Sequence, residues 1–373
     1  MIYLDSAATS MLKPDSVSYA VIEAMSNMGS PGRGAHEAAM RAADTCFDCR
    51  ENLARLFHVP KPENVVFTFN ATHGLNIAID SLIKRRARVL TTGYEHNSVV
   101  RPLRALDARL DVIRTPLFDR RALLKEFRAR IPQADAAVFT HVSNVFGYIL
   151  PVEEMAALCR QYRKPFIIDA SQSAGVLELD FEKLGADFVA MPGHKGLMGP
   201  QGTGVLLCKN EASPLLYGGS GSNSRLPLMP DFLPDRLEAG THNVAGIAGL
   251  NAGVKYILAR GCGSLFAHER RLLDGMAESL GDCGQLRLYY SPRPECQSGV
   301  LSLVPEGAGC DWLGDRLSEQ GIAVRTGLQC APFAHETVGT LDTGTVRFSF
   351  SPFNSREEAA RTVDILKKII KNS

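Results

Sequence analysis

The stretch PFIIDASQSAGVLELDFEKLGADFVAMPGHKG, residues 165–196, holds two short apolar runs, and each run leads into polar and glycine residues. Strand-like runs of the same kind recur from about residue 64 to residue 208, as NVVFTF, RVLTT, AAVFTHVS and GVLLC. Amphipathic segments with helical spacing, such as GLNIAIDSLIKRR and VEEMAALCRQYRK, lie between the runs. This alternation predicts an α/β fold with a mostly parallel sheet that helices cover on both faces.

The pattern changes after residue 250. A helix-rich segment is followed by the run LSLVP, a turn-rich stretch that contains Cys330, the run TVRFSFS and a terminal helix. Ser355 and Glu358 have the spacing of a capping box at the start of that helix. We therefore expect a large α/β domain at residues 14–250 and a smaller α+β domain made of residues 1–13 and 251–373.

The composition is that of an ordinary soluble enzyme, with 45% hydrophobic and 22% charged residues over 373 positions. The 41 basic and 40 acidic residues leave a formal charge of +1, so we expect no nucleic-acid partner and no anionic membrane surface. The first residues, MIYLDSAATS, lack a signal-peptide pattern, and no segment has the apolar length of a membrane span. These observations predict a cytoplasmic protein, in which the nine irregularly spaced cysteines are reduced thiols.

One pair of cysteines, Cys46 and Cys49, forms a C-x-x-C pattern in DTCFDCRENLARLF. No second pair follows at zinc-finger spacing, and the surrounding residues have the pattern of an amphipathic helix. We interpret the pair as incidental helix residues and predict no metal site, with a redox or metal role as the alternative.

Two of the strand-end loops carry groups suited to an anion and to a flat ring. In FNATHGLN, Ala71 and Thr72 stand where a helix begins, and the N–H groups and hydroxyl at a helix N-terminus can hold a phosphate. In GYEHNSV, the imidazole of His96 can stack on an aromatic ring. Each residue also has an ordinary alternative, because Thr often caps helices without a ligand and a loop His is often solvated.

Two further loops carry a carboxylate and an amine. In IIDASQS, Asp169 leaves an apolar strand and needs a partner such as a protonated pyridine nitrogen, and Gln172 can reach the same ligand. In MPGHKGLMGPQGTG, Lys195 lies in a glycine-rich loop where it can form a Schiff base with an aldehyde. A turn-capping Asp and a solvated Lys are the alternatives. The four loops together predict pyridoxal phosphate as the cofactor, because one ligand at the strand ends could touch them all.

The stretch AVRTGLQCAPF, residues 323–333, places Cys330 between a glycine turn and a proline. Loops of this kind run over surfaces, so the cysteine is not expected to serve only as a core residue. Arg325 stands five positions upstream, and a nearby guanidinium favours the thiolate, which is the nucleophilic form of cysteine.

These motifs give the chain a resemblance to the cysteine desulfurase and selenocysteine lyase family, in the class V aminotransferase group of fold-type I pyridoxal phosphate enzymes. The likeness runs nearly from end to end, through YLDSAAT, EHNSV, HVSNVFG, IDASQS, GHK, EAGTHN, RTGLQCAP and VRFSFSPFN. It implies a seven-stranded type of sheet and a homodimer with shared active sites. The implied reaction converts L-cysteine to L-alanine and leaves the sulfur as a persulfide on Cys330, for delivery to an acceptor protein or thiol.

The resemblance also implies roles for single residues. Lys195, Cys330 and His96 would carry the catalysis, with Lys195 holding the cofactor and His96 stacking on its ring. Asp169 would pair with the pyridine nitrogen, and Gln172 would bind the phenolic oxygen. The cofactor phosphate would be held at Ala71, Thr72 and His194, and by Thr241 of the neighbouring subunit. The substrate would be bound by Asn144, Arg347 and Arg325, where a guanidinium suits a carboxylate.

The chain departs from the family pattern at three positions. Pro192 stands where many members have a serine that contacts the phosphate, and Leu328 and Gln329 stand where one or two histidines are common. Alternative functions are a selenocysteine lyase, another class V enzyme with the same cofactor, and a non-enzymatic sulfur or metal carrier. A transaminase or epimerase has no need of a thiol in this loop, whereas the sequence does not separate cysteine from selenocysteine as the substrate.

Overall fold

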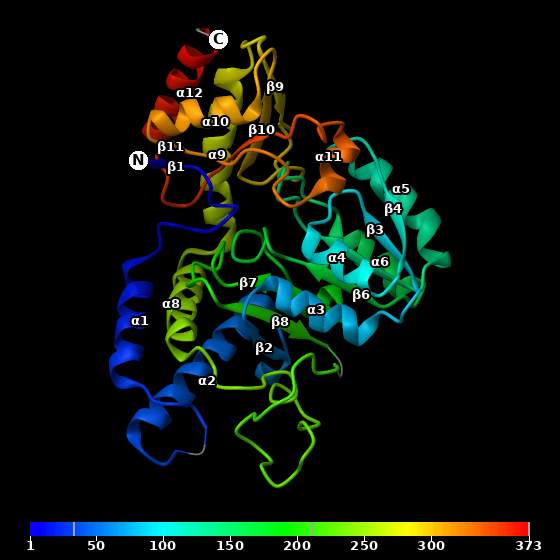
Figure 1. Ribbon diagram of the computed structural model, residues 1–373, viewed down its shortest axis with the longest axis vertical. Coiled ribbons are helices and arrows are strands. Elements are labelled where there is room, and N and C mark those ends of the chain that lie inside the picture. Colours follow the sequence, from blue (N-terminus) through cyan, green and yellow to red (C-terminus); the bar gives the residue numbers. More distant parts are fainter. Residues whose placement is uncertain (33, 210–211, 372–373) are drawn as a thin grey trace.

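The computed structural model describes residues 1–32, 34–209 and 212–371. Within them the largest sheet has seven strands in the order β2-β8-β7-β6-β5-β3-β4 (Figure 1). Their bounds are β2 Val65–Thr68, β3 Arg88–Thr92, β4 Arg109–Ile113, β5 Ala136–Thr140, β6 Phe166–Asp169, β7 Phe188–Pro192 and β8 Gly204–Cys208. Only β8 runs antiparallel to its neighbours, so the predicted α/β fold with a mostly parallel sheet is confirmed.

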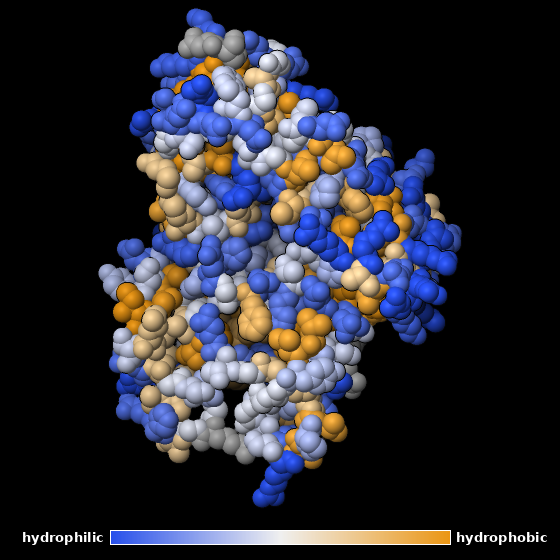
Figure 2. Space-filling model, viewed as in Figure 1, coloured by the Kyte–Doolittle hydropathy of each residue, from blue (hydrophilic) through white to orange (hydrophobic). Residues whose placement is uncertain are grey.

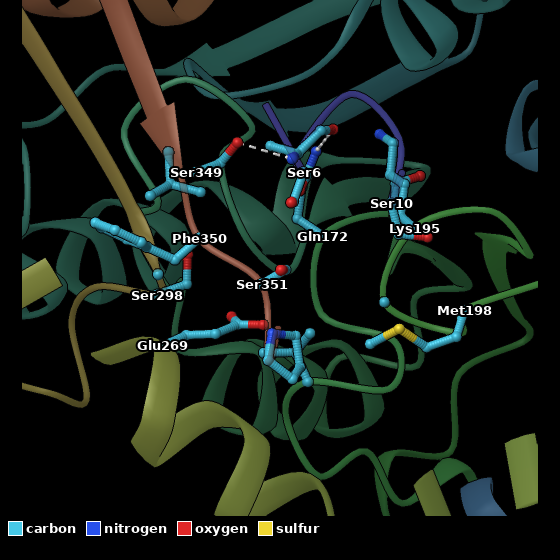
Figure 3. Close-up of a pocket in the computed structure, with 17 residues that line it drawn as sticks. Ser6, Ser10, Gln172, Lys195, Met198, Glu269, Ser298, Ser349, Phe350 and Ser351 are labelled. Carbon is cyan, nitrogen blue, oxygen red and sulfur yellow. Dashed lines mark hydrogen bonds between the residues drawn. The ribbon is translucent and has the colours of Figure 1, made fainter. Parts of the chain in front are cut away.

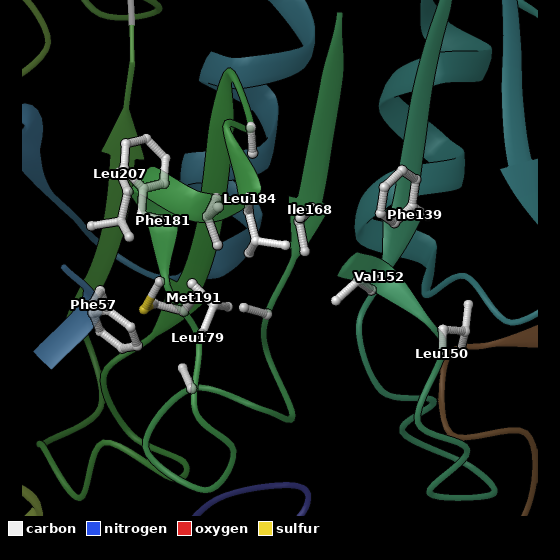
Figure 4. Packing of buried hydrophobic residues seen from close by; sticks show 14 of the residues in the cluster. Phe57, Phe139, Leu150, Val152, Ile168, Leu179, Phe181, Leu184, Met191 and Leu207 are labelled. Atoms are coloured by element: carbon white, nitrogen blue, oxygen red, sulfur yellow. The ribbon is translucent and has the colours of Figure 1, made fainter. Parts of the chain in front are cut away.

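Helices cover both faces of this sheet because successive strand residues point to opposite sides. Val65 and Phe67 belong to a larger core cluster, whereas Val66 between them belongs to a second cluster on the other face. Figure 4 shows strand residues of the larger cluster, among them Ile168 and Met191. The larger cluster includes residues of α2 (Glu37–Phe57), α5 (Arg120–Arg130), α6 (Val152–Gln161), α7 (Phe181–Leu184) and α8 (Val244–Arg260). The second includes residues of α3 (Ala71–Leu82) and α4 (Asn97–Ala105), and α1 (Asp15–Asn27) packs on α8.

A third core cluster lies in the upper part of Figure 1, where both chain termini are found. It packs around a three-stranded sheet of order β12-β10-β9, and β1 pairs in parallel with β11 beside it. The strands are β1 Ile2–Tyr3, β9 Leu286–Tyr289, β10 Val300–Pro305, β11 Ile322–Ala323 and β12 Val346–Ser349. The helices are α9 Cys262–Leu280, α10 Cys310–Glu319, α11 Pro332–Val338 and α12 Arg356–Lys371, and two short 3₁₀ turns elsewhere are η1 Pro62–Asn64 and η2 Ile131–Gln133. The two-domain division stays a prediction, and α8 continues through residue 250.

Four strands, β1, β4, β9 and β11, were not among those expected from the sequence. In β4, the charged side chains of Arg109 and Asp111 alternate with apolar ones, and Asp111 forms ion pairs with Arg88 and Arg130. An edge strand with one charged face lacks the continuous apolar run that marked the central strands.

The capping box at the start of α12 is confirmed. The N–H of Glu358 donates to Ser355 Oγ at 3.2 Å, and the N–H of Ser355 donates to a Glu358 carboxylate oxygen at 3.1 Å. The reciprocal pair satisfies two N–H groups at the start of the helix, as the spacing of the two residues predicts.

Cys46 and Cys49 are both buried on α2. Burial raises the pKa of the Cys46 thiol to about 11, with the charge of Arg50 acting in the opposite direction. Burial also raises the pKa of Cys49. Such thiols pack as small apolar side chains and are poor nucleophiles at neutral pH. Among the helices of the described residues, none combines the length and the apolar character needed to cross a membrane.

Candidate active site

A cavity lies at the carboxyl ends of the parallel strands, with about 670 Å³ of space that no atom fills. Most of the residues predicted to bind the cofactor or substrate line it: Ala71, Thr72, His96, Asn144, Asp169, Gln172, His194 and Lys195. These residues follow different strands. Parallel pairing brings the ends of β3, β5, β6 and β7 to one edge of the sheet, and β2 ends at the same edge because the antiparallel β8 lies between it and β7.

The N-terminus of α3 forms one end of the cavity. The side chain of Asn70 caps this helix by accepting the N–H of His73 at 2.9 Å, so Thr72 is not the capping residue. The hydroxyl of Thr72 lies 2.7 Å from Ser98 Oγ instead. The first N–H groups of a helix have no partners within it, and together with these hydroxyls they form a donor set suited to an anion.

His96 caps α4 from the cavity wall. Its Nδ1 accepts the N–H of Ser98 at 3.0 Å and lies 2.9 Å from the Ser98 hydroxyl. Burial lowers the pKa of His96, and the nearby Asp169 acts against this shift. A neutral, oriented imidazole is suited to stacking on a flat ring. Ser98 was not singled out from the sequence, although it lies in the same EHNS motif and lines the cavity.

Asp169 and Lys195 stand at the ends of neighbouring strands. Asp169 is 2% exposed, and its Oδ1 accepts the N–H of Ser171 at 2.9 Å. Burial lowers the pKa of Lys195 to about 8, while the Asp169 carboxylate opposes this shift and the charge of Arg347 adds to it. An amine with such a pKa is in part unprotonated near neutral pH, as a lysine that forms a covalent bond to an aldehyde must be.

The N-terminal segment of the chain closes the cavity beside His194. Nδ1 of His194 lies 3.0 Å from Thr9 Oγ1, and the His194 carbonyl accepts from the Ser10 hydroxyl at 2.9 Å. Burial lowers the pKa of His194 to about 4, helped by the charges of Lys195 and Lys13. Sequence reasoning missed Lys13 because no motif surrounds it, yet it places a second cation close to His194.

Both predicted substrate arginines pair with Asp5, and neither is among the residues that line the cavity. Arg347 is 2% exposed, its Nη2 donates to Asp5 at 2.8 Å, and its Nη1 donates to the carbonyl of Asn144 at 2.9 Å. Nε of Arg347 has no partner in the described part of the chain. Arg325, about half exposed, donates to the same carboxylate at 2.7 Å. Asp5 was not singled out from the sequence, although the motif YLDSAAT contains it.

Thr241 lies apart from the other predicted cofactor residues. It is exposed and lines a second pocket, together with Phe69, His73 and Glu238. The resemblance assigned this threonine to the active site of a neighbouring subunit, and that role stays a prediction.

Cys330 is exposed, and hydrogen bonds tie its loop to the edge of the cavity. The carbonyl of Cys330 accepts the N–H of Asn97 at 2.8 Å. The side-chain amide of Asn144 donates to the carbonyl of Gln329 at 2.7 Å. Asn97 directly follows His96 and Asn144 lines the cavity, so these bonds hold the Cys330 loop at the edge of the cavity although it is distant in sequence.

Figure 3 shows a further cavity, to whose lining Lys195 also contributes. Glu269 and Ser298 line it on one side, and Ser10 and Gln172 line it on the other. Glu269 is 6% exposed and makes no hydrogen bond or ion pair within the described residues, and burial raises its pKa to about 8. Gln172 donates to the carbonyl of Ala7 at 2.9 Å, which holds the N-terminal segment against this loop.

Comparisons with known proteins agree with this geometry. The family model described as Aminotransferase class-V matches residues 2–362. A probable cysteine desulfurase of Pyrococcus abyssi is 34% identical, with 100% of this chain and 95% of that protein covered. A probable cysteine desulfurase of Aeropyrum pernix is 32% identical, with 99% and 94% covered. The apo structure of a cysteine desulfurase from Thermococcus onnurineus superposes with a TM-score of 0.91 at 32% identity, covering 100% of this chain and 95% of that one. A cysteine desulfurase structure from Escherichia coli gives a TM-score of 0.86 at 26% identity, covering 99% and 94%.

Proposed function

We propose that this chain, which belongs to the cysteine desulfurase family of the class-V aminotransferases, converts L-cysteine to L-alanine and takes up the sulfur on Cys330. The observation that carries the proposal is that a loop with an exposed thiol is hydrogen-bonded to residues around a cavity containing a buried carboxylate and a lysine of lowered pKa. The names of the relatives favour cysteine over selenocysteine as the substrate.

The residues of the cavity fit pyridoxal phosphate as the cofactor. The helix N-terminus at Ala71 and Thr72, with His194 opposite, supplies donors for a phosphate. The carboxylate of Asp169 suits a protonated ring nitrogen, and His96 and Gln172 line the space between. When bound, this cofactor supplies an electron sink for the pair of electrons that remains when the α-proton of the substrate leaves. Pro192 has no hydroxyl or N–H to give the phosphate, so the remaining groups would carry that contact alone.

Lys195 has the properties of the base that removes the α-proton. Its lowered pKa leaves a substantial fraction of unprotonated amine near pH 8. The negative charge of Asp169 stabilises the protonated amine after the transfer, because that charge raises the lysine pKa. The amine can therefore both accept a proton and return it.

Cys330 is the nucleophile for the sulfur. Its thiolate attacks the substrate Sγ, so a sulfur–sulfur bond forms and the substrate Cβ–Sγ bond breaks. The electron pair of the broken bond remains on the substrate carbon, which takes up a proton and becomes the methyl group of alanine. Cys330 keeps the transferred sulfur as a persulfide until an acceptor protein or small thiol removes it.

The substrate carboxylate is assigned to Arg347 and Asn144. The unpartnered Nε of Arg347 is a donor left free beside the groups already bound to Asp5. A guanidinium binds a carboxylate through paired N–H donors, so the arrival of substrate would share or replace the pairing with Asp5. Arg325 keeps Asp5 paired during such an exchange.

We include a homodimer in the proposal, with Thr241 of one subunit facing the phosphate site of the other. Large apolar side chains are exposed on α1, at Tyr19, Ile22 and Met25. Figure 2 shows apolar residues gathered over this helix. Exposed apolar groups in such number support a subunit contact. The expected cytoplasmic location and the unidentified sulfur acceptor remain part of the same proposal.

The test is to supply the protein with pyridoxal phosphate and L-cysteine and to measure alanine together with the mass of the Cys330 peptide. We expect alanine and a persulfide on Cys330 in the wild type. Cys330→Ser should still change the cofactor absorbance on adding cysteine but release negligible alanine, because a hydroxyl cannot take up the sulfur. Cys283→Ser, at a partly buried thiol, is the matched control and should behave as wild type. Alanine release at the wild-type rate from Cys330→Ser would refute the assignment.

A further inference from the structure

The side chain of Gln329, the residue before the proposed nucleophile, points into a set of buried polar groups. Its Nε2 donates to the carbonyl of Thr345 at 3.1 Å and to that of Arg325 at 3.5 Å. Its Oε1 lies 3.1 Å from Nε2 of His335 and 3.3 Å from the hydroxyl of Thr345. Nδ1 of His335 lies 2.8 Å from the hydroxyl of Thr340. All four polar atoms of the glutamine and the histidine therefore have partners.

The proton positions in this set follow from the partners. One terminal atom of the Gln329 side chain faces two carbonyl oxygens, so this atom must be the amide nitrogen Nε2. The other terminal atom is then the oxygen Oε1, which must accept from His335. His335 therefore carries its proton on Nε2, and its Nδ1 accepts the hydroxyl of Thr340. His335 is fully buried, and burial lowers its pKa to about 4, so the ring stays neutral in this tautomer.

The main chain at this point has an unusual conformation. Gln329 and Cys330 both have positive φ, at 42° and 58°. A left-handed conformation is unfavourable for residues other than glycine. Two such residues in succession keep it only where surrounding contacts enforce it. Two hydrogen bonds hold the outer side of this turn, from the Asn144 amide to the carbonyl of Gln329 and from the Asn97 N–H to that of Cys330.

We propose that Gln329 and His335 are positioning residues that hold the Cys330 turn in its left-handed form and so present Sγ toward the substrate. The buried side chain of His335 fixes Gln329 from inside, and the hydrogen bonds from Asn97 and Asn144 fix the main chain from outside. Without the hydrogen bond between His335 and Gln329, the turn can relax to the right-handed region of φ and ψ that most residues adopt. The direction of the thiol then changes with the main chain. The effect on the reaction rests on the proposed function. The clamp, meaning the hydrogen bonds of Gln329 with His335 and of the turn with Asn97 and Asn144, is a property of the protein without substrate.

The first test measures hydrogen exchange in the protein without substrate. The N–H groups of Ala331 and Asn97 report on the turn, because they donate to the carbonyls of Leu328 and Cys330. We expect Gln329→Ala and His335→Ala to speed exchange at both amides at least tenfold. Glu336→Gln is the matched control, since this exposed neighbour of His335 pairs with Arg114 at the surface. Unchanged exchange in Gln329→Ala, at a partly exposed position that leaves the core intact, would overturn the proposal.

The second test follows a single turnover with L-cysteine in the protein loaded with cofactor. The clamp variants should keep the wild-type change in cofactor absorbance but form the Cys330 persulfide at least tenfold more slowly. Because the two side chains act through one hydrogen bond, the double variant should be no slower than the slower single one. Persulfide formation within twofold of wild type in both variants, or fully additive effects, would contradict the clamp. If the wild type formed no persulfide, the proposed function would fail, while the exchange experiment would still decide the clamp.

Discussion

Replacing Arg347 by alanine tests the assignment of the substrate carboxylate and the buried ion pair together. The change removes the bond to Asp5 at 2.8 Å and the bond to the carbonyl of Asn144 at 2.9 Å. Because Arg325 still pairs with Asp5, that carboxylate is not left alone. We expect unfolding to require about 3 kcal/mol less, the low end of the range for a buried pair that loses one partner. For the substrate, losing the charge-assisted pair should cost about 2–5 kcal/mol, or about 30-fold to 5000-fold in kcat/KM.

The assay combines urea unfolding with the kinetics of alanine release over a range of cysteine concentrations. The fall in kcat/KM should come more from a higher KM than from a lower kcat. The cofactor should remain bound, because Arg347 is not among the residues that line the cofactor cavity. Arg325→Ala is the comparison, since its side chain is 49% exposed and an exposed pair contributes about 0–1 kcal/mol. If kcat/KM stayed at the wild-type value in Arg347→Ala, or fell further in Arg325→Ala, the assignment of Arg347 would be wrong.

Two further predictions concern titration. Only the unprotonated amine of Lys195 can bond to an aldehyde, and burial sets its pKa at about 8, so uptake of pyridoxal phosphate by the apo-protein should quicken with pH until about 8 and then level off. A rate independent of pH between 6.5 and 8.5, followed by absorbance, would argue against it. Burial raises the pKa of Glu269 in the folded protein to about 8. Between the pKa of the unfolded chain and about pH 8, the folded protein therefore keeps a proton that the unfolded chain has released. The free energy of unfolding falls as pH rises through this range. Glu269→Gln should therefore melt at a higher temperature than wild type at pH 8.5 and show a smaller difference at pH 5, and the opposite order would count against a buried, unpaired carboxyl.

The central strands could be predicted because each is buried on both faces. Such strands appear in sequence as short, nearly uninterrupted apolar runs, and FIID and FVAM have this form in β6 and β7. The edge strand β4 could not be found in this way, because one face meets solvent and carries Arg109 and Asp111. The capping box of α12 was predictable since both partners lie within one helical turn of each other.

The candidate site was predictable where a residue follows a strand directly. Lys195 and Asp169 stand close to strand ends, so the sheet alone determines that they meet. Asp5 could not be placed, because its partners Arg325 and Arg347 lie 320 and 342 positions away. Lys13 donates to the nearby Ser10, and only tertiary packing brings this segment to His194, which is 184 positions from Ser10. His335 was missed for another reason: a buried histidine five residues after a cysteine has no distinctive pattern until the orientation of Gln329 is known.

Asn144 is the point at which the proposed binding of substrate and the clamp on Cys330 meet. Its carbonyl accepts from Arg347, and its side-chain amide donates to the carbonyl of Gln329. A substrate carboxylate that reached Arg347 would arrive beside the same amide, which has a second hydrogen to give. Because that bond can form without breaking the bond to Gln329, substrate can bind while the turn stays held. The inner contact between His335 and Gln329 is likewise complete in the protein without substrate, so the polar groups of these two residues are already satisfied before the substrate arrives.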